Sequence, residues 1–261
     1  MKEVTENLSA NGTVQLDIVI PVLNEGQAFV SCLKSLREHV QIPFRVFVGY
    51  DFEEDITLKA LQDPSIRGME IIPVKNAGKG PASAVITAFT ATSAPAVMVF
   101  TADDIYNADL IGRLYDEFEK GNDVVCCSRF AEGGVIRDVS FVKKSLPFLA
   151  SKLLYHFARL PTHDATCGIK LFSRRVITQI PIESKTGFSF SIELTVKVHR
   201  LGWGISEIPA RWFVREHNEK TFKALSWIPA YLPWFFFAFA TSYLGRGPET
   251  VTLKERERST S

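Results

Sequence analysis

The sequence predicts an α/β protein built on a mostly parallel, doubly wound sheet with flanking helices. Short apolar runs alternate with segments of helical periodicity throughout the first half of the chain. Polar residues follow each of these apolar runs, as expected where strands end at a ligand-binding edge. No repeat or low-complexity segment interrupts the alternation.

The first predicted strand is the apolar run at 16–22, which contains Asp17 and ends from Pro21 onward. Such a run is typical of a buried parallel strand. A helix follows at 27–40, where apolar residues recur at helical spacing. A second helix is predicted at 81–92, because Pro81 suits a first helical turn. The other elements expected in this half are strands at 45–48, 69–74, 97–100 and 123–127 and helices at 55–61 and 110–120.

The second half has a different character. A helix is expected at 141–160, although Pro147 interrupts its pattern. The remaining elements are a helix at 190–201 and short strands at 170–172, 204–209 and 210–214. Because no linker separates the halves, we expect one domain at 12–223, an aromatic segment at 224–245 and a disordered tail at 246–261.

Composition excludes some classes of protein. The 261 residues carry a formal net charge of +1, so a nucleic-acid binder with a broad basic field is not expected. The four cysteines show neither metal-ligand spacing nor a paired framework, which favours buried free thiols in a reducing compartment. Residues 1–11 have no apolar signal core. We therefore expect a cytoplasmic protein, peripheral to the cytoplasmic face of a membrane.

The membrane expectation comes from residues 227–244, which are dense in Trp, Tyr and Phe. The part without proline, 234–244, is too short to span about 30 Å of hydrocarbon. Since aromatic residues prefer the membrane interface, a helix lying on the bilayer is one interpretation. A dimer surface and a buried core helix are the alternatives.

Polar residues converge at the expected carboxyl edge of the sheet. Asn24, Glu25, Gly78 and Gly80 have ordinary alternative roles as cap or turn residues. Asp103 follows a buried strand directly, where a carboxylate is better explained by a divalent cation bound to diphosphate oxygens. For Arg129 the alternative to an anion contact is a surface ion pair.

These motifs, in this order, give the chain a resemblance to the family 2 glycosyltransferases with the GT-A fold, most closely the dolichol-phosphate mannose synthase-like group. The matching pieces are Ile-Pro-Val-Leu-Asn-Glu (20–25), Asp51 with Asp55, Asn76-x-Gly-x-Gly (76–80), Ala-Asp (102–103), Ser-Arg-Phe (128–130) with Gly133-Gly134, Asp-x-Thr-x-Gly (164–168), Glu193-Leu194, Glu207-x-Pro209 and Arg215.

The resemblance implies roles for particular residues. Asp103 would bind Mg²⁺ or Mn²⁺, Arg129 would meet the acceptor phosphate, and Arg215 would steady the leaving diphosphate. The nucleotide-binding residues would be Pro21, Leu23, Asn24, Glu25, Asp51, Asn76 and Lys79. Further acceptor-side residues would be Asp104, Lys143, Lys144, Asp164, Glu193 and Lys220.

The chain also departs from the family pattern. Thr101 stands where the family has the first carboxylate of Asp-x-Asp, and Ile105 replaces a glutamine ligand of some relatives. Lys143 or Lys144 would replace a second basic residue for the acceptor phosphate. Lys220 would supply a charge from one residue earlier than in the family.

The resemblance implies an inverting enzyme that moves a sugar from a nucleotide diphosphate to a polyprenyl phosphate, at a membrane surface and in a possible homodimer. Two alternatives remain. Transfer to a sugar hydroxyl would need a carboxylate base, for which Asp164 or Glu193 is the candidate. A non-catalytic nucleotide-sugar-binding subunit would be consistent with the missing first carboxylate.

Overall fold

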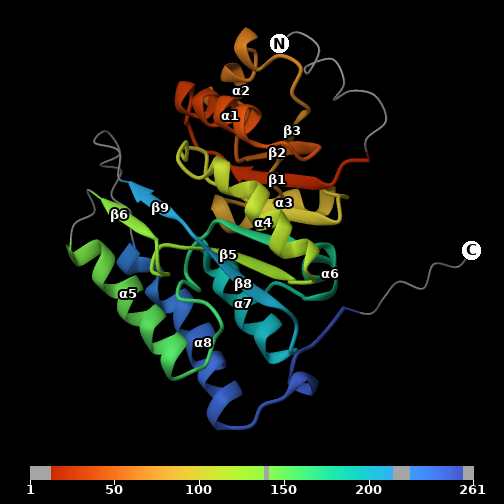
Figure 1. The fold of residues 1–261 in the computed structure, drawn as a ribbon. Helices are drawn as coiled ribbons and strands as arrows, with labels where there is room; N and C mark the ends of the chain where they lie inside the picture. The colour runs from red at the N-terminus through yellow and green to blue at the C-terminus, as the bar shows by residue number, and fades with distance from the viewer. Residues whose placement is uncertain (1–12, 138–140, 214–223, 255–261) are drawn as a thin grey trace, which may run out of the picture.

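A computed structural model describes residues 13–137, 141–213 and 224–254, excluding the side chains of 141–144 and 224–227 (Figure 1). Its main sheet has seven strands in the order β3-β2-β1-β4-β7-β5-β8. They are β3 (Ile71–Lys75), β2 (Phe44–Tyr50), β1 (Leu16–Pro21), β4 (Ala96–Val99), β7 (Lys170–Ser173), β5 (Val124–Ser128) and β8 (Ile205–Pro209). All are parallel except β7, which pairs antiparallel with β4 and β5. The predicted mostly parallel sheet is therefore confirmed.

The strand order changes direction between β1 and β4. From β1 the chain builds outward through β2 to β3, and it then returns to place β4 on the other side of β1. The loops that leave the carboxyl ends of β1 and β4 consequently diverge. In open α/β sheets, ligands bind in the crevice at such a switch point.

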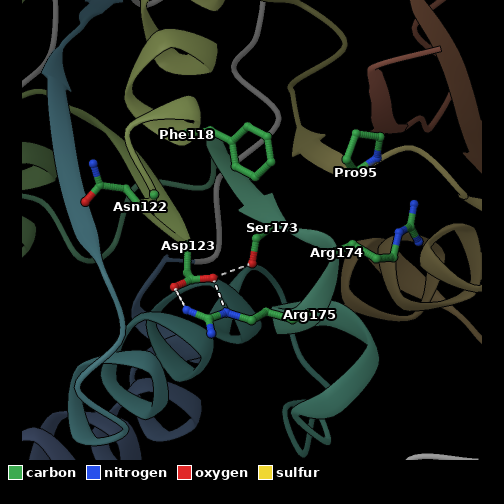
Figure 2. A pocket seen from close by; sticks show the side chains of 8 residues that line it. Pro95, Phe118, Asn122, Asp123, Ser173, Arg174 and Arg175 are labelled. Atoms are coloured by element: carbon green, nitrogen blue, oxygen red, sulfur yellow. Dashed lines mark hydrogen bonds and ion pairs between the residues drawn. The ribbon is translucent and has the colours of Figure 1, made fainter. Parts of the chain in front are cut away.

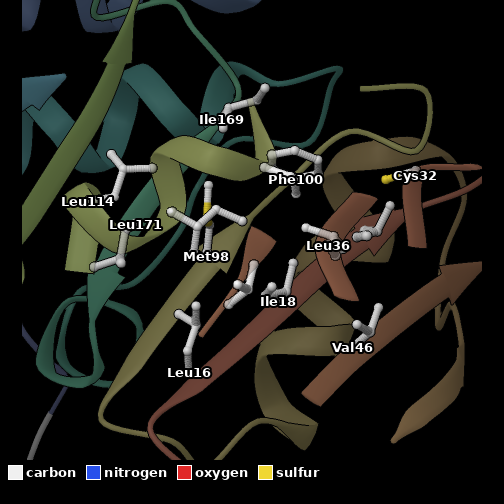
Figure 3. Packing of buried hydrophobic residues seen from close by; sticks show 14 of the residues in the cluster. Leu16, Ile18, Cys32, Leu36, Val46, Met98, Phe100, Leu114, Ile169 and Leu171 are labelled. Carbon is white, nitrogen blue, oxygen red and sulfur yellow. The ribbon is translucent and has the colours of Figure 1, made fainter. Parts of the chain in front are cut away.

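Helices cover both faces of the sheet. Helices α1 (Gln27–His39) and α4 (Ile111–Glu119) bury their apolar residues on one face, where Leu36 and Leu114 pack around strand residues such as Ile18 and Met98 (Figure 3). The opposite face is covered by α3 (Gly80–Ala91), α6 (Arg174–Gln179) and α7 (Ser189–Arg200). A short α2 (Ile56–Ala60) follows β2. Burial on both faces explains why the strands read as continuous apolar runs.

Two more helices form a third layer outside α7. Helix α5 (Phe141–His156) lies beside α8 (Ala224–Tyr243), and both pack on α7 around Ile192 and Val196 (Figure 1). Trp234 and Ala238 of α8 are buried in this cluster. The other side of α8 is also apolar, and Phe236 there is 64% exposed. Among the described helices, none has both the length and the apolar character needed to cross a membrane.

The sequence missed some elements. Strand β6 (Val135–Arg137) pairs with β9 (Arg211–Phe213) in a separate small sheet, and only β9 is predicted. A three-residue strand has too few positions to show an alternating pattern. Helix α6 was also not predicted, and α5 continues through Pro147.

Part of the expected disordered tail is ordered. Residues Pro248–Thr250 form a 3₁₀ helix, and the Val251 side chain is buried. The backbone N–H of Lys254 donates to the carbonyl of Gln179, 2.7 Å away. Tertiary contacts hold this segment where its polar composition alone suggests disorder.

Asp17 explains the polar break in the first apolar run. Its carboxylate is fully buried and accepts hydrogen bonds from Arg45 Nε at 2.9 Å and Nη2 at 3.0 Å. It also accepts the backbone N–H groups of Ser93 and Ala94 at 2.7 and 2.8 Å. This carboxylate therefore joins β1 to β2 and to the turn before β4.

We predict that Asp17→Asn lowers the free energy of unfolding by about 3–5 kcal/mol, because it leaves the Arg45 guanidinium without its buried partner. Chemical denaturation at neutral pH measures this. Glu53→Gln is the control, because the Lys75–Glu53 pair is exposed and such pairs contribute little. Equal stability of Asp17→Asn and the parent would show that Asp17 is not a stabilising junction.

Candidate active site

Hydrogen bonds to residues 55 and 57 hold the backbone of the loop after β1 in place. Asn24 has a φ of 56°, a left-handed conformation that asparagine tolerates better than most residues. Its backbone N–H donates to both oxygens of the buried Asp55 carboxylate, at 3.1 and 3.0 Å. The N–H of Glu25 donates to Thr57 Oγ1 at 2.9 Å. The residue before α1 is Gly26, which offers no side-chain cap, and Asn24 Oδ1 instead accepts the backbone N–H of Ile56 at the start of α2, at 3.4 Å.

The predicted nucleotide-binding residues around this loop lie at the surface. Leu23 and Asn24 are exposed, and Pro21 and Glu25 are partly exposed. Because the loop is fixed through its backbone, its exposed side chains are presented on a rigid support.

The loops after β2 and β3 are joined to each other. Asp51 Oδ1 accepts from Asn76 Nδ2 at 2.5 Å, and its Oδ2 accepts the backbone N–H of Gly80 at 2.9 Å. Asn76 Oδ1 in turn accepts the N–H of Gly78 at 2.9 Å and Ser83 Oγ at 2.7 Å. The Asp51 and Asn76 side chains thus shape the glycine-rich turn, and Lys79 within it is exposed.

Asp103 and Asp104 differ in their surroundings. Asp104 accepts the N–H groups of Tyr106 and Asn107 at 2.7 and 3.0 Å, and Asn107 Nδ2 at 2.6 Å. Burial raises the pKa of Asp104 despite these hydrogen bonds. Asp103 is partly exposed, and no described residue donates a hydrogen bond to it. Asp104 therefore shapes the loop, whereas Asp103 contributes no hydrogen bond to it within the described residues.

Asn107 connects this loop to β9. Its Nδ2 donates to the Arg211 carbonyl at 2.9 Å, and its Oδ1 accepts the Arg211 N–H at 2.9 Å. The Arg211 guanidinium also pairs with Asp109 at 2.6 Å. These contacts fix the start of β9 beside the end of β4.

Arg129 follows β5 and makes a bidentate ion pair with Asp164. Its Nε and Nη2 donate to the two carboxylate oxygens at 2.6 and 2.9 Å, and its backbone N–H donates to Oδ2 at 3.1 Å. Nη2 also donates to Thr166 Oγ1 at 3.0 Å. The Trp212 ring lies 4.7 Å from the guanidinium carbon. The ion pair considered as the alternative for Arg129 therefore exists, but its carboxylate is fully buried and the pair is not a surface one.

The backbone around Arg129 also requires close approach. A Cβ atom at Gly134 would lie 2.5 Å from the Arg129 carbonyl oxygen, so only glycine fits there. Tyr231 of α8 interacts electrostatically with Arg129, and burial raises the pKa of this tyrosine to about 12. Helix α8 therefore reaches the Arg129 site.

The two carboxylates considered as a catalytic base are both committed to other contacts. Asp164 is bound to Arg129, as described. Glu193 is fully buried in α7, accepts the N–H groups of Glu183 and Ser184 at 2.7 and 2.8 Å, and pairs with Lys197 at 2.7 Å. Glu193 is therefore not assigned to the acceptor side of the site, because its carboxylate anchors the 183–184 turn.

Some predicted site residues lie outside the described part of the chain. These are Arg215 and Lys220, together with the side chains of Lys143 and Lys144 at the start of α5.

Four further residues support the site loops, and the sequence did not indicate a role for them: Asp55, Asn107, Trp212 and Lys170. Only Asp55 belongs to a motif quoted from the sequence, and nothing in that motif indicates which backbone groups it binds.

A surface pocket of about 410 Å³ lies at the opposite edge of the sheet (Figure 2). Its lining includes Asp123 before β5, Ser173 at the end of the antiparallel β7, and Arg175. Asp123 Oδ1 accepts from Ser173 Oγ at 2.7 Å, and Asp123 pairs with Arg175. These contacts satisfy the polar groups among themselves, so we assign the pocket no part in the site.

Comparison with known proteins decides the family. Residues 17–180 match the family described as "Glycosyl transferase family 2", which is well over half of the chain. The chain belongs to this family. It is a glycosyltransferase, as the resemblance predicted, and the matched region contains every strand end of the candidate site up to Asp164.

The individual relatives share low sequence identity with the chain. The chain is 26% identical over 212 residues to "Dolichyl-phosphate hexose transferase" of Haloferax volcanii, covering 78% of this chain and 86% of that protein. It is 22% identical over 217 residues to "Dolichol-phosphate mannosyltransferase" of Pyrococcus furiosus, covering 80% and 60%. It is 26% identical over 117 residues to "Polyprenol monophosphomannose synthase" of Mycolicibacterium smegmatis, covering 44% of each. The chain thus spans less than two thirds of two of these relatives.

Solved structures support the fold. Glucosyl-3-phosphoglycerate synthase from Mycobacterium tuberculosis, in complex with Mn²⁺, uridine diphosphate and glucosyl-3-phosphoglycerate, superposes with a TM-score of 0.64 at 19% identity. The match covers 87% of this chain and 80% of that one. The predicted GT-A fold is confirmed.

The Arg129–Asp164 ion pair should make the stability of the protein depend on pH. Burial opposes ionisation of Asp164, but the Arg129 guanidinium outweighs it and holds the pKa of Asp164 below its ordinary value. Its stabilising effect is therefore present at neutral pH and is lost as pH falls below about 4. We predict that Asp164→Asn lowers the free energy of unfolding by about 3–5 kcal/mol at pH 7.

Urea denaturation of parent and variant between pH 3 and 7 tests this, and the difference between them should shrink at the acidic end. Asp109→Asn is the control, because the Arg211–Asp109 pair is exposed. A difference that stays constant across this pH range would contradict the assigned ionisation.

Proposed function

We propose that this glycosyltransferase moves a sugar, with inversion, from a nucleoside diphosphate to a polyprenyl-type lipid phosphate. The observation that carries the proposal is the switch point between β1 and β4. There the Asn24 loop and the Asp103 carboxylate leave neighbouring strands, and Arg129 follows β5 at the same edge of the sheet. The activities after which the relatives from three organisms are named favour a lipid phosphate as acceptor.

The donor would occupy the side of the site formed by β1, β2 and β3. The exposed Leu23 and Lys79, together with the loops that Asp55 and Asp51 hold, offer apolar, amide and cationic groups to a nucleotide. Asp51 would contribute mainly by fixing the 76–80 turn, because both of its oxygens already accept hydrogen bonds.

A divalent metal fits this side of the site only with help from the donor. No cluster of three or more ligating side chains occurs among the described residues. Asp103 offers one carboxylate without a described hydrogen-bond partner, and diphosphate oxygens and water would complete the ligand set of a hard cation. A bound Mg²⁺ or Mn²⁺ would neutralise charge that develops on the leaving diphosphate.

The acceptor phosphate would approach Arg129. Burial alone would lower the pKa of Arg129, but Asp164 raises it, so the guanidinium keeps its charge. Asp164 and Thr166 fix its orientation. A phosphate oxygen of the lipid would then attack the anomeric carbon as the bond to the diphosphate breaks, which inverts that carbon. No protein base is needed, since the nucleophile is already an anion.

The need for a protein base distinguishes a hydroxyl acceptor from a phosphate acceptor. A sugar hydroxyl must lose a proton, and the two carboxylates suggested as bases are bound to Arg129 and to Lys197. The geometry therefore favours a phosphate acceptor over a hydroxyl acceptor.

The experiment that tests the function pairs donors with acceptors. UDP-, GDP- and dTDP-sugars are each incubated with Mn²⁺ and a polyprenyl phosphate, a polyprenol or a soluble glycan. Mass spectrometry should detect a polyprenyl phosphosugar with one donor and no product from the polyprenol. A product on the glycan only would overturn the proposed acceptor.

We predict that Asp103→Asn removes the effect of Mn²⁺ on nucleoside diphosphate affinity and leaves the fold intact. Titration calorimetry with and without Mn²⁺ measures this without turnover. Asp109→Asn, on the same loop but exposed and paired with Arg211, should retain the metal effect. An unchanged Mn²⁺ effect in Asp103→Asn would exclude this carboxylate as the ligand.

Peripheral attachment to the cytoplasmic face of a membrane would bring the lipid phosphate to this site. Exposed apolar side chains occur on α5, at Leu146, Phe148 and Leu149, and on α8, at Leu232 and Phe236. Neither helix contains an acidic residue, and the two lie side by side (Figure 1). Exposed apolar side chains on two adjacent helices that lack acidic residues suit an interface that carries anionic lipids.

We predict that the double variant Leu149→Glu/Phe236→Glu no longer co-sediments with anionic liposomes and keeps its thermal unfolding temperature. Point variants are preferred to removal of residues 234–261, because Trp234 and Ala238 belong to the buried cluster. Leu253→Glu, beside α6, is the control for an added charge. If the double variant still binds liposomes but loses self-association on analytical ultracentrifugation, the face is a dimer surface.

A further inference from the structure

Lys170 is a fully buried lysine at the centre of the sheet. Antiparallel pairing of β7 places it opposite Val99 of β4 and Cys126 of β5. It therefore lies between the two strands whose ends lead to Asp103 and Arg129. The proposed function gives this side chain no part.

The Lys170 ammonium group has a complete set of acceptors. Nζ donates to the carbonyl oxygens of Ala165 and Cys167 at 2.7 and 3.0 Å, and to Ser191 Oγ of α7 at 2.6 Å. Ser191 Oγ donates to the same Cys167 carbonyl at 2.7 Å. An ammonium nitrogen offers three donors from one atom, which matches three acceptors that converge on one point.

The two carbonyls lie on either side of Thr166. The side chains of Thr166 and Asp164 are the ones that hold the Arg129 guanidinium. The Lys170 ammonium thus binds backbone carbonyl groups of the 164–168 loop, and side chains of the same loop bind Arg129. None of the three acceptors of Nζ is a carboxylate, and the charge of Lys170 also favours the ionised form of Asp164.

We propose that Lys170 is a positioning residue for glycosyl transfer, which sets the Asp164–Gly168 loop so that Arg129 is oriented toward the acceptor phosphate. The inference rests on the proposed function of Arg129. It predicts a defect in turnover that leaves donor binding intact, because Lys170 acts on the acceptor side of the site. Misplacement of a binding group by about 1 Å costs up to about 100-fold in rate.

Lys170→Gln and Lys170→Met test the proposal, with Lys197→Met as the matched control. Lys197 is also buried, but its Nζ donates to the Pro181 carbonyl and to Glu183 and Glu193, away from this loop. Both methionine variants should lose stability. Only the Lys170 variants should lose kcat, by about 10- to 100-fold, with nucleoside diphosphate affinity unchanged. Parent-like kcat in folded Lys170→Gln, or an equal loss in Lys197→Met, would overturn the proposal.

A double-variant cycle in unfolding separates this proposal from the proposed function. Lys170→Gln and Asp164→Asn are compared singly and together by urea denaturation. If Lys170 sets the loop, their effects on the unfolding equilibrium constant should be non-additive by about tenfold. Additive effects would overturn the positioning role. Non-additive effects in a protein that shows no transfer to a lipid phosphate would retain the Lys170–loop coupling and reject only the acceptor assignment.

Discussion

The structure of the candidate site depends on one buried ion pair, between Arg129 and Asp164. The carboxylate accepts hydrogen bonds from the guanidinium and from the Arg129 backbone N–H. Its negative charge also offsets the unfavourable free energy of burying the Arg129 cation. Because Arg129 follows β5 and Asp164 precedes β7, the pair joins two chain segments that are adjacent only in the folded sheet. The Trp212 ring of β9 lies over the guanidinium. Residues after β5, before β7 and in β9 therefore all contact the Arg129 side chain or backbone.

A common design is visible in the other loops. Aspartate carboxylates at the strand ends accept backbone N–H groups of the loops and so fix the course of the backbone there. Asp55 holds Asn24, Asp51 holds Gly80 and Asp104 holds Asn107. Each carboxylate offers several acceptor positions to N–H groups that no strand or helix satisfies. Rigid loops at the carboxyl ends of the strands are the consequence, and they suit the recognition of a polar donor.

Helix α8 has a buried side and an exposed side, so the core packing considered from the sequence describes only part of it. Trp234 and Ala238 make it part of the core, and Phe236 on its other side is exposed. Tyr231 links the same helix to Arg129 electrostatically. The helix that carries the exposed Phe236 therefore also reaches the Arg129 site.

The α/β class, most of the strands and helices, and the family could be predicted from the sequence, because burial on both faces of the sheet produces continuous apolar runs and the motifs keep their order. It also indicated Asp103, in the loop after β4, and Arg129, directly after β5, as candidate site residues. It did not reveal β6, the ordered 248–254 segment or the roles of Asp104 and Glu193, since a carboxylate that anchors a turn has the same letter as one that meets a ligand. The folded structure was needed to show that Asp164 binds Arg129 and that Lys170 supports their loop, because those contacts join residues 35 positions apart or involve backbone groups.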